Sequence, residues 1–224
     1  INAGNATLQN PANITLPGTY SLTVTNTSNN CVNTDVLVVA IDTILPTVSA
    51  GADLVLNCYN NAIDTLDASA SSVGANFSVV WSGPGITPGN QNDLMPVVSL
   101  PGVYNVTITN TDNNCSASAL ATVSSDIAPP TADAGVDPTI DCVNTSTSIG
   151  GNSSSGAGIT YLWTGPGINP ANAGSFQPVV NVPGNYTLVV TNTGNGCTAS
   201  DNMVVNTDAV YPAVSAGADG LITC

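Results

Sequence analysis

The chain has 224 residues, only 6% of them charged, and every charged side chain is an Asp, which gives a formal net charge of −14. Because Lys, Arg and His are absent, the chain lacks the cations that bind nucleic acids or anionic membranes. It also lacks the usual base of a hydrolase triad and the His ligands of a zinc site, so an enzyme is the least favoured class.

Residues 1–43 are predicted to contain a β-hairpin. After Pro17-Gly18, the apolar residues Tyr20, Leu22 and Val24 alternate with polar residues, and this period of two is typical of a half-buried strand. The Pro-Gly pair favours a type II turn, with the glycine at positive φ. An Asn-rich loop, Cys31 and a second apolar stretch follow, which completes a hairpin signal.

The same pattern returns twice, so the chain is a tandem array. Pro-Gly-x-Tyr ends at Tyr20, Tyr104 and Tyr186, with offsets of 84 and 82 residues. The expected boundaries lie at three linkers that begin with Asp and end with Pro, namely 42–46, 126–130 and 208–212. We therefore expect four segments: the C-terminal part of a truncated repeat (1–43), two complete repeats (unit 1, 44–127, and unit 2, 128–209) and the first strand of a further repeat (210–224).

Aromatic residues mark the expected core of each unit. Trp81 and Trp163 end the strand-like stretches FSVVW and ITYLW, where an immunoglobulin-like sandwich places its core Trp. Tyr20, Tyr104 and Tyr186 each follow a Pro-Gly turn at the start of a strand, the position of the tyrosine corner in Greek-key sandwiches. The predicted fold class is all-β, with tandem immunoglobulin-like Greek-key sandwiches in an extended array.

A family resemblance rests on the order of these motifs. The chain contains PTADAG at 130–135, LDASASS at 66–72, YLWTGPG at 161–167, PGNYTLVVT at 183–191 and GCTA at 196–199. The first of these motifs opens a repeat and the others follow it in the order given, although LDASASS is quoted from unit 1 and the rest from unit 2. In this order within a repeat, they resemble the PKD-like or immunoglobulin-like repeats of giant Bacteroidetes surface proteins, such as gliding-motility adhesins and other type IX secretion substrates. The resemblance implies an extracellular stalk at a bacterial cell surface, with neighbouring repeats of the same chain as partners. The GPG after the Trp and the paired cysteines depart from archetypal PKD units.

The cysteines occupy two positions per unit. Cys58, Cys142 and Cys224 end the first strand of a unit, whereas Cys31, Cys115 and Cys197 begin its last strand. Pairing Cys31 with Cys58 spans two strands laid end to end, far beyond the limit of about 7 Å between bridged Cα atoms. Pairing Cys58 with Cys115 joins opposite ends of one Greek-key sandwich, although a shifted register would allow it.

Stacking of the units offers a third pairing. The end of unit 1 that carries its first loop abuts the end of unit 2 that carries its last hairpin, so Cys58 is expected to meet Cys197. We favour this bridge, with the pairing within a unit as the alternative and free thiols as a further one. Metal binding by the cysteines is less favoured than a disulfide, because no CxxC motif or His accompanies any Cys. Disulfides indicate an oxidising, extracellular setting.

Asp and Thr residues offer two further candidate sites. Asp42, Asp53, Asp126, Asp133 and Asp137 lie near the linkers, where carboxylates can bind calcium between domains, but without a dense DxDxDG run solvated Asp is favoured. No cofactor is otherwise expected. Asp42-Thr43-Ile44 and Asp64-Thr65-Leu66 look like the acceptor motif of Bacteroidetes O-glycosylation, which makes Thr43 and Thr65 candidate acceptors.

The sequence as a whole favours a structural stalk that provides reach and mechanical stability. The alternative is a carbohydrate-binding or protein-binding module acting through the loops at 86–95 and 168–176. These loops are plain and similar in length, whereas a binder is expected to elaborate one of them, so the stalk is favoured. The expected partners are neighbouring repeats, with lateral or filament self-association, and neither nucleic acid nor membrane insertion in this segment. The sequence does not reveal an adhesion target.

Overall fold

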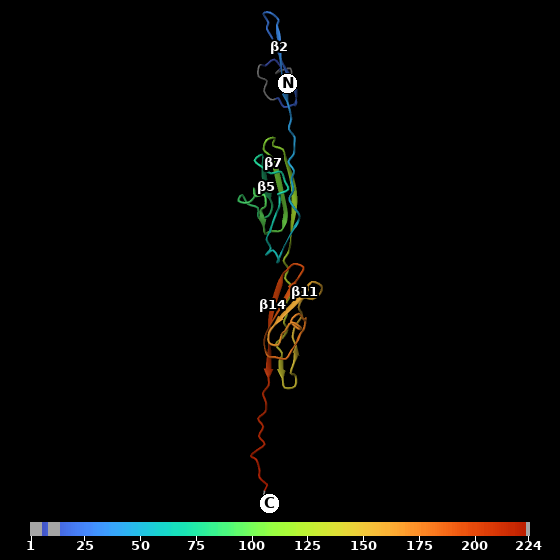
Figure 1. Ribbon diagram of the computed structural model, residues 1–224, viewed down its shortest axis with the longest axis vertical. Helices are drawn as coiled ribbons and strands as arrows, with labels where there is room; N and C mark the ends of the chain where they lie inside the picture. Colours follow the sequence, from blue (N-terminus) through green and yellow to red (C-terminus); the bar gives the residue numbers. More distant parts are fainter. Residues whose placement is uncertain (1–5, 9–13, 223–224) are drawn as a thin grey trace.

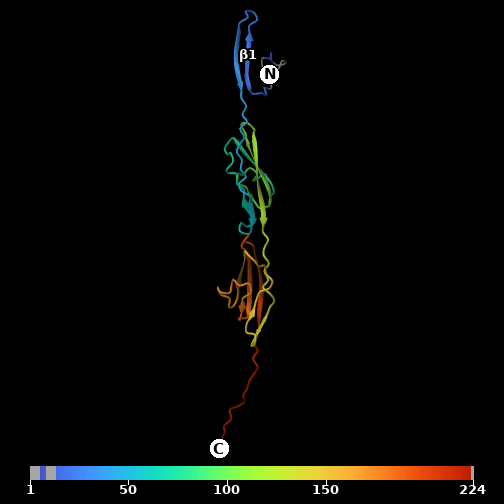
Figure 2. The ribbon, with the colours of Figure 1, turned by 90° about the vertical axis from the view of Figure 1, so that its right-hand side faces the viewer.

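The structure is a computed structural model that describes residues 6–8 and 14–222 (Figure 1). All its regular elements are β-strands in those ranges. A hairpin, two sandwiches and an extended C-terminal segment follow one another along one long axis, as both side views show (Figures 1 and 2). Within the described part of the chain no helix has the length and apolar character needed to cross a membrane.

Fourteen strands are formed by the described residues. The N-terminal hairpin consists of β1 (Gly18–Thr25) and β2 (Val32–Val39). Unit 1 contains β3 (Leu54–Asn57), β4 (Asp64–Thr65), β5 (Phe77–Ser82), β6 (Val97–Val98), β7 (Gly102–Asn110) and β8 (Ser116–Asp126). Unit 2 contains β9 (Thr139–Asp141), β10 (Thr147–Ser148), β11 (Ile159–Thr164), β12 (Val179–Val180), β13 (Gly184–Asn192) and β14 (Thr198–Asp208).

Both units have one topology. In unit 1 a four-stranded sheet of order β3-β8-β7-β5 faces the two-stranded sheet β4-β6. Along the chain, β3 and β5 belong to the larger sheet and alternate with β4 and β6 of the smaller sheet, and β7 and β8 then complete the larger sheet. Strand β3 lies parallel to β8, whereas the other strand pairs of unit 1 are antiparallel. Unit 2 repeats this order as β11-β13-β14-β9 with β10-β12. Each unit is therefore an immunoglobulin-like β-sandwich, as the sequence predicts.

The alternating pattern of β7 and β13 builds the cores. Tyr104, Val106 and Ile108 are fully buried on one face of β7, and the polar residues between them face outward. Tyr186, Leu188 and Val190 do the same on β13, and Trp81 and Trp163 are buried at the centre of the two clusters. The indole Nε1 of Trp163 donates a hydrogen bond to the carbonyl of Ser175 at 3.1 Å, whereas Trp81 Nε1 has no partner among the described residues.

The tyrosine corner is present at all three repeats. Tyr104 donates its phenolic hydrogen to the carbonyl oxygens of Leu100 and Pro84, at 2.7 Å in both cases. Tyr186 contacts Val182 and Pro166 in the same way. The bond to the residue four positions earlier holds the strand to the turn that precedes it.

Tyr20 differs from the prediction that it is a core residue. Its hydroxyl makes the corner bond to the carbonyl of Leu16 at 2.7 Å, but the side chain is only half-buried. The physical reason is that β1 pairs only with β2 among the described residues, so no second sheet covers the face that carries Tyr20. A corner hydrogen bond is local, whereas burial needs the whole sandwich.

The Pro-Gly pairs also differ from the type II turn that the sequence favours. Gly102 has φ of 151°, far from the value of about 80° of the second central residue in that turn. It is the first residue of β7, and a Cβ added there would lie 2.6 Å from Cγ of Pro84. A glycine is therefore required at position 102, because the backbone there lies too close to Pro84 in the loop after Trp81 to leave room for a Cβ atom.

Residues 209–222 form no regular strand, although the sequence predicts the first strand of a further unit there. In the two complete units the corresponding strands, β3 and β9, pair with the last strand of their own unit. Among the described residues no strand pairs with the backbone N–H and C=O groups of this segment, which is extended and exposed.

Candidate functional site at the junction between the units

The most distinctive feature of the molecule is the junction between units 1 and 2. It consists of the turn after β3 (57–60), the linker 126–130 and the tip of the β13–β14 hairpin (192–197). A disulfide bond joins Cys58 to Cys197 across it, with an S–S distance of 2.00 Å and a Cα–Cα distance of 5.0 Å. This is the pairing that the sequence favours. Cys197 is fully buried.

Backbone and side-chain contacts accompany the bridge. The N–H of Cys58 donates to the carbonyl of Asn195 at 2.9 Å, and the hydroxyl of Tyr59 donates to the carbonyl of Thr193 at 3.0 Å. The ring of Tyr59 packs against Gly196, where an added Cβ would lie 2.8 Å from the ring. Gly196 has φ of +75°, which a glycine adopts without strain. The turn of unit 1 therefore fits directly on the hairpin of unit 2.

Asn195 fixes the linker as well as the hairpin. Its amide nitrogen donates to the carboxylate of Asp126 at 2.9 Å and to the carbonyl of Ala128 at 3.0 Å, while its amide oxygen accepts from the N–H of Cys197 at 3.0 Å. Asn195 is almost completely buried. A buried amide with all of these partners holds its neighbours in one geometry, so the linker is tied to unit 2 independently of the disulfide.

The strand register explains why Cys58 does not pair with Cys115. Because β3 runs parallel to β8 with Asn57 opposite Asp126, Cys58 lies beside the end of β8. Cys115 lies just before the start of β8, which is 11 residues long. At about 3.3 Å per residue, the strand separates the two cysteines by roughly 35 Å. The alternative pairing within a unit is therefore absent, and so is a bridge between Cys31 and Cys58.

The other cysteines of the described ranges are free thiols. Cys31 and Cys142 are exposed, and Cys115 is partly exposed. Cys224 lies outside the described residues, so the structure does not test its role.

The five Asp residues considered as calcium ligands each accept at least one hydrogen bond within the protein. Asp42 caps the N–H of Ile44, and Asp126 binds Asn195. Asp133 accepts from the N–H groups of Asn152 and Gly135, and these two bonds lower the pKa of its carboxyl group. No three acidic, Cys or His side chains gather as a metal site within 6–8 and 14–222. Calcium binding stays an untested prediction.

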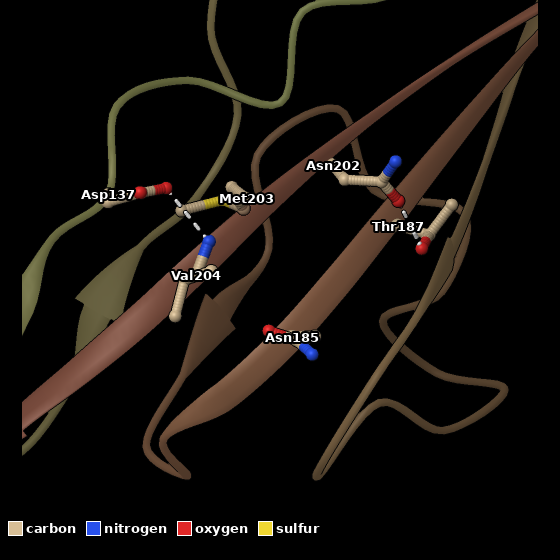
Figure 3. Close-up of a pocket in the computed structure, with 6 residues that line it drawn as sticks. All are labelled: Asp137, Asn185, Thr187, Asn202, Met203 and Val204. Atoms are coloured by element: carbon tan, nitrogen blue, oxygen red, sulfur yellow. Dashed lines mark hydrogen bonds between the residues drawn. The ribbon is translucent and has the colours of Figure 1, made fainter.

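Asp53 and Asp137 clamp the first strand of each unit to its last strand. The carboxylate of Asp53 accepts from the N–H of Thr122 at 2.7 Å, and that of Asp137 accepts from the N–H of Val204 at 2.8 Å. Figure 3 shows Asp137 and Val204 at a shallow pocket on the outer face of unit 2, next to the hydrogen bond between Thr187 and Asn202. The polar groups of Asp137, Thr187 and Asn202 are engaged in these two hydrogen bonds. The repetition of the clamp in unit 1 indicates a structural role.

The candidate glycosylation residues are both accessible in part. Thr43 is exposed in the linker before unit 1. Thr65 is half-buried in β4, on the face opposite to the buried Leu66. The modification of either residue stays a prediction.

Sequence reasoning missed Tyr59, Asn195 and Gly196. A signal for the Asn was present, because Asn-x-Cys precedes the last strand at 29–31, 113–115 and 195–197. In all three copies the Asn side chain accepts from the N–H of the Cys. At the linker 42–46, the side chain of Asn113 also donates a hydrogen bond to the carbonyl of Ile44 at 3.1 Å, just as Asn195 does to the carbonyl of Ala128 at the linker 126–130.

Comparison with known proteins gives structural likeness only. No protein-family model and no curated protein matches the sequence. Among solved structures, immunoglobulin domains 1–5 of Sidekick-1 are 16% identical over 88% of this chain, with a TM-score of 0.41, and the chain spans 48% of that structure.

Two further immunoglobulin arrays are similar to the chain. The eight N-terminal immunoglobulin domains of the Down Syndrome Cell Adhesion Molecule are 14% identical over 85% of this chain, which spans 31% of that structure, with a TM-score of 0.46. The insect immune protein hemolin is 12% identical over 85% of this chain and 56% of that one, with a TM-score of 0.39. At such low identities and TM-scores we draw nothing about function from these proteins.

Proposed function

We propose that this chain is a mechanical spacer, a segment of the shaft of an extracellular bacterial surface adhesin. One observation carries the proposal: the covalent bridge joins two different sandwiches at their facing ends. A bridge inside one domain stabilises that domain, whereas a bridge between domains fixes their relative orientation. The buried Asn195 and the contact of Tyr59 with Gly196 act in the same direction.

The bridge also redirects tension. Cys58 follows β3 near the start of unit 1, and Cys197 precedes β14 near the end of unit 2, at a sequence separation of 139 residues. When the chain is pulled from its ends, force passes from β3 through the two sulfur atoms into β14. Strands β4–β13 lie outside this path, so tension does not extend the part of the chain between the two cysteines.

The motif resemblance to Bacteroidetes repeats supports a place on a bacterial cell surface, including gliding-motility adhesins and other proteins secreted by the type IX system. The disulfide supports an oxidising compartment. The absence of Lys, Arg and His supports a role without acid–base catalysis, nucleic-acid binding or binding to anionic lipid.

Single-molecule force spectroscopy on the full chain, held at residues 44 and 209, tests the proposal. In the oxidised protein, the stretch between the cysteines, whose sequence separation is 139, is predicted to stay hidden, which shortens the extension by roughly 460–500 Å at about 3.3–3.6 Å per residue. Reduction, or the double substitution Cys58→Ser with Cys197→Ser, is expected to restore that length in two unfolding steps. The matched control, Cys115→Ser with Cys142→Ser, keeps it hidden. Release of the full length from the oxidised wild-type chain would overturn the proposal.

A further inference from the structure

The tip of the β13–β14 hairpin carries the one Asn-Gly pair of the sequence, Asn195-Gly196. At such a pair an Asn side chain loses its amide group readily, because a glycine has no Cβ to keep its backbone nitrogen away from the preceding side chain. In the corresponding turns of the other two repeats the second residue is Asn30 or Asn114, with φ of 58° in both cases. The labile pair is therefore confined to the junction between units 1 and 2.

The contact with unit 1 requires this glycine. A Cβ added to Gly196 would stand 2.8 Å from the ring of Tyr59, and φ of the glycine is +75°. An Asn, as in the other two turns, would leave no room for the ring. The junction therefore obtains its close fit from a residue that makes the preceding Asn195 chemically labile.

The closed junction engages both groups that take part in deamidation. The amide nitrogen of Asn195 donates to Asp126 at 2.9 Å and to Ala128 at 3.0 Å. The backbone N–H of Gly196, which is the nucleophile of the reaction, donates to the carbonyl of Asn192 at 2.8 Å. Asn195 is only 1% exposed, so water has little access to its side chain. The reaction therefore needs the junction to open first.

Deamidation of an opened junction takes two steps. The backbone nitrogen of Gly196 gives its proton to water and attacks Cγ of Asn195, and a C–N bond forms as the bond to the side-chain nitrogen breaks. That nitrogen takes up a proton from water and leaves as ammonia, so the product is a cyclic succinimide. Water then adds to one of the two ring carbonyl carbons, and the ring C–N bond breaks to give an Asp or an isoaspartate at position 195. Water is the only reagent, and nothing is oxidised or reduced.

The product cannot rebuild the junction. A carboxylate at position 195 has no hydrogen to donate, so the bonds to Asp126 and Ala128 are lost. Closing the junction would also bury a negative charge beside the carboxylate of Asp126, which is unfavourable. In the isoaspartate form the main chain is longer by one methylene group, which displaces the carbonyl that accepts from the N–H of Cys58.

From these observations we propose that Asn195 is a site of spontaneous deamidation that the closed junction protects, and that its conversion makes opening of the junction irreversible. The disulfide lowers the fraction of open molecules and thereby slows the reaction. The inference goes beyond the proposed spacer function, because it concerns the chemical lifetime of the junction and not the load that the chain carries.

The protection is tested by incubating the full oxidised chain in neutral buffer and following the peptide that contains position 195 by mass spectrometry. An opened variant has three substitutions at the junction, and a matched control has three away from it: Cys58→Ser, Cys197→Ser and Tyr59→Ala against Cys115→Ser, Cys142→Ser and Tyr211→Ala. The opened variant should deamidate at least about tenfold faster than the wild type and the control, because a disulfide of ordinary strength shifts the opening equilibrium by more than that.

Hydrogen exchange of β13 in the same proteins separates opening of the junction from unfolding of unit 2, because this core strand should stay protected in all of them. If the opened variant loses that protection, Tyr59→Ala alone, which keeps the bridge, is compared with Tyr211→Ala and should still deamidate faster. The wild type in urea gives the unprotected rate. A folded wild type that deamidates as fast as its denatured chain, or opened variants no faster than their controls, would overturn the inference.

The irreversible step has its own test. Asn195→Asp is compared with Asn113→Asp, the same change in the corresponding hairpin of unit 1. After reduction and reoxidation with oxidised glutathione, the bridge of Cys58 with Cys197 should form at about tenfold lower yield in Asn195→Asp, because the buried charge opposes closure. Equal yields would refute irreversibility. The pulling experiment uses the wild-type chain with Asn195 intact, so the proposed spacer function stands or falls separately.

Discussion

At the scale of single residues, the corner tyrosines connect the core with the turns. Tyr104 is fully buried, and its one hydroxyl group satisfies two carbonyl oxygens, those of Leu100 and Pro84. A hydroxyl has one hydrogen, so the two contacts share it, and both carbonyls depend on the same side chain.

Replacing Tyr104 with Phe removes that hydroxyl, so the carbonyl groups of Leu100 and Pro84 lose their hydrogen-bond donor. We expect the free energy of unfolding to fall by about 1–3 kcal/mol, which chemical denaturation measures. Tyr211 is exposed and serves as the matched control, because Tyr211→Phe should change nothing. A Tyr104→Phe variant as stable as the wild type would show that the corner bonds contribute no net stability.

The same tyrosines predict a loss of stability in alkali. Burial raises the pKa of Tyr104 and of Tyr186 above the ordinary value of 10.0. Below pH 10 both folded and unfolded chains keep these protons, so the contribution is complete. As the pH rises above that value, the unfolded chain loses protons first, and the free energy of unfolding decreases until the folded tyrosines ionise too.

Denaturation at pH 8 to 11 measures this effect in a chain whose Cys31, Cys115, Cys142 and Cys224 are replaced with Ser, which prevents thiol exchange. The decrease should be smaller in the double variant Tyr104→Phe with Tyr186→Phe. Equal alkaline losses in the two proteins would assign the effect to other groups.

The residue pattern predicts the aromatic core well, and the reason is physical. Alternation at Tyr104, Val106 and Ile108 specifies one buried face because the side-chain period of a strand is two. Tyr59 and Asn195 were not predictable in this way, because they act between units. Their contacts depend on how two sandwiches are placed, which local alternation does not encode.

At the scale of elements, β3 and β9 show that strand formation depends on a partner. The C-terminal segment carries the same SAGAD motif as the segment before β3, yet it forms no strand. The sequence predicts a strand there because local pattern carries no information on whether the partner strand is present. The half-buried Tyr20 has the same cause.

The Pro-Gly pair at the start of β7 gives a prediction at this scale. In Gly102→Ala the new Cβ meets Pro84 at 2.6 Å, so the loop after Trp81 must move. We expect a loss of about 1–3 kcal/mol in the free energy of unfolding. Gly89→Ala is the matched control, since its Cβ would meet only Thr87 Oγ1, at 3.6 Å. Equal stability of the two variants would refute the close-packing explanation of the motif.

At the scale of the whole molecule, the two units share no hydrophobic core. Each of the two buried clusters lies within one unit. The units are held together instead by the bridge, by the hydrogen bonds of Tyr59 and Asn195, and by the packing of Tyr59 on Gly196. A junction of this kind gives a stiff connection between two separately folded domains, which suits a spacer.

The disulfide between Cys58 and Cys197 sets the geometry of the junction, and peptide mapping under non-reducing conditions identifies the partner of Cys58. The chain has no Lys or Arg, so trypsin does not cut it, and digestion requires proteases that cleave at Asp and at aromatic residues. We expect a linked peptide pair that contains Cys58 and Cys197 and separates on reduction. A peptide pair that joins Cys58 to Cys115 would contradict it, because that bridge lies within one unit and leaves the junction free to hinge.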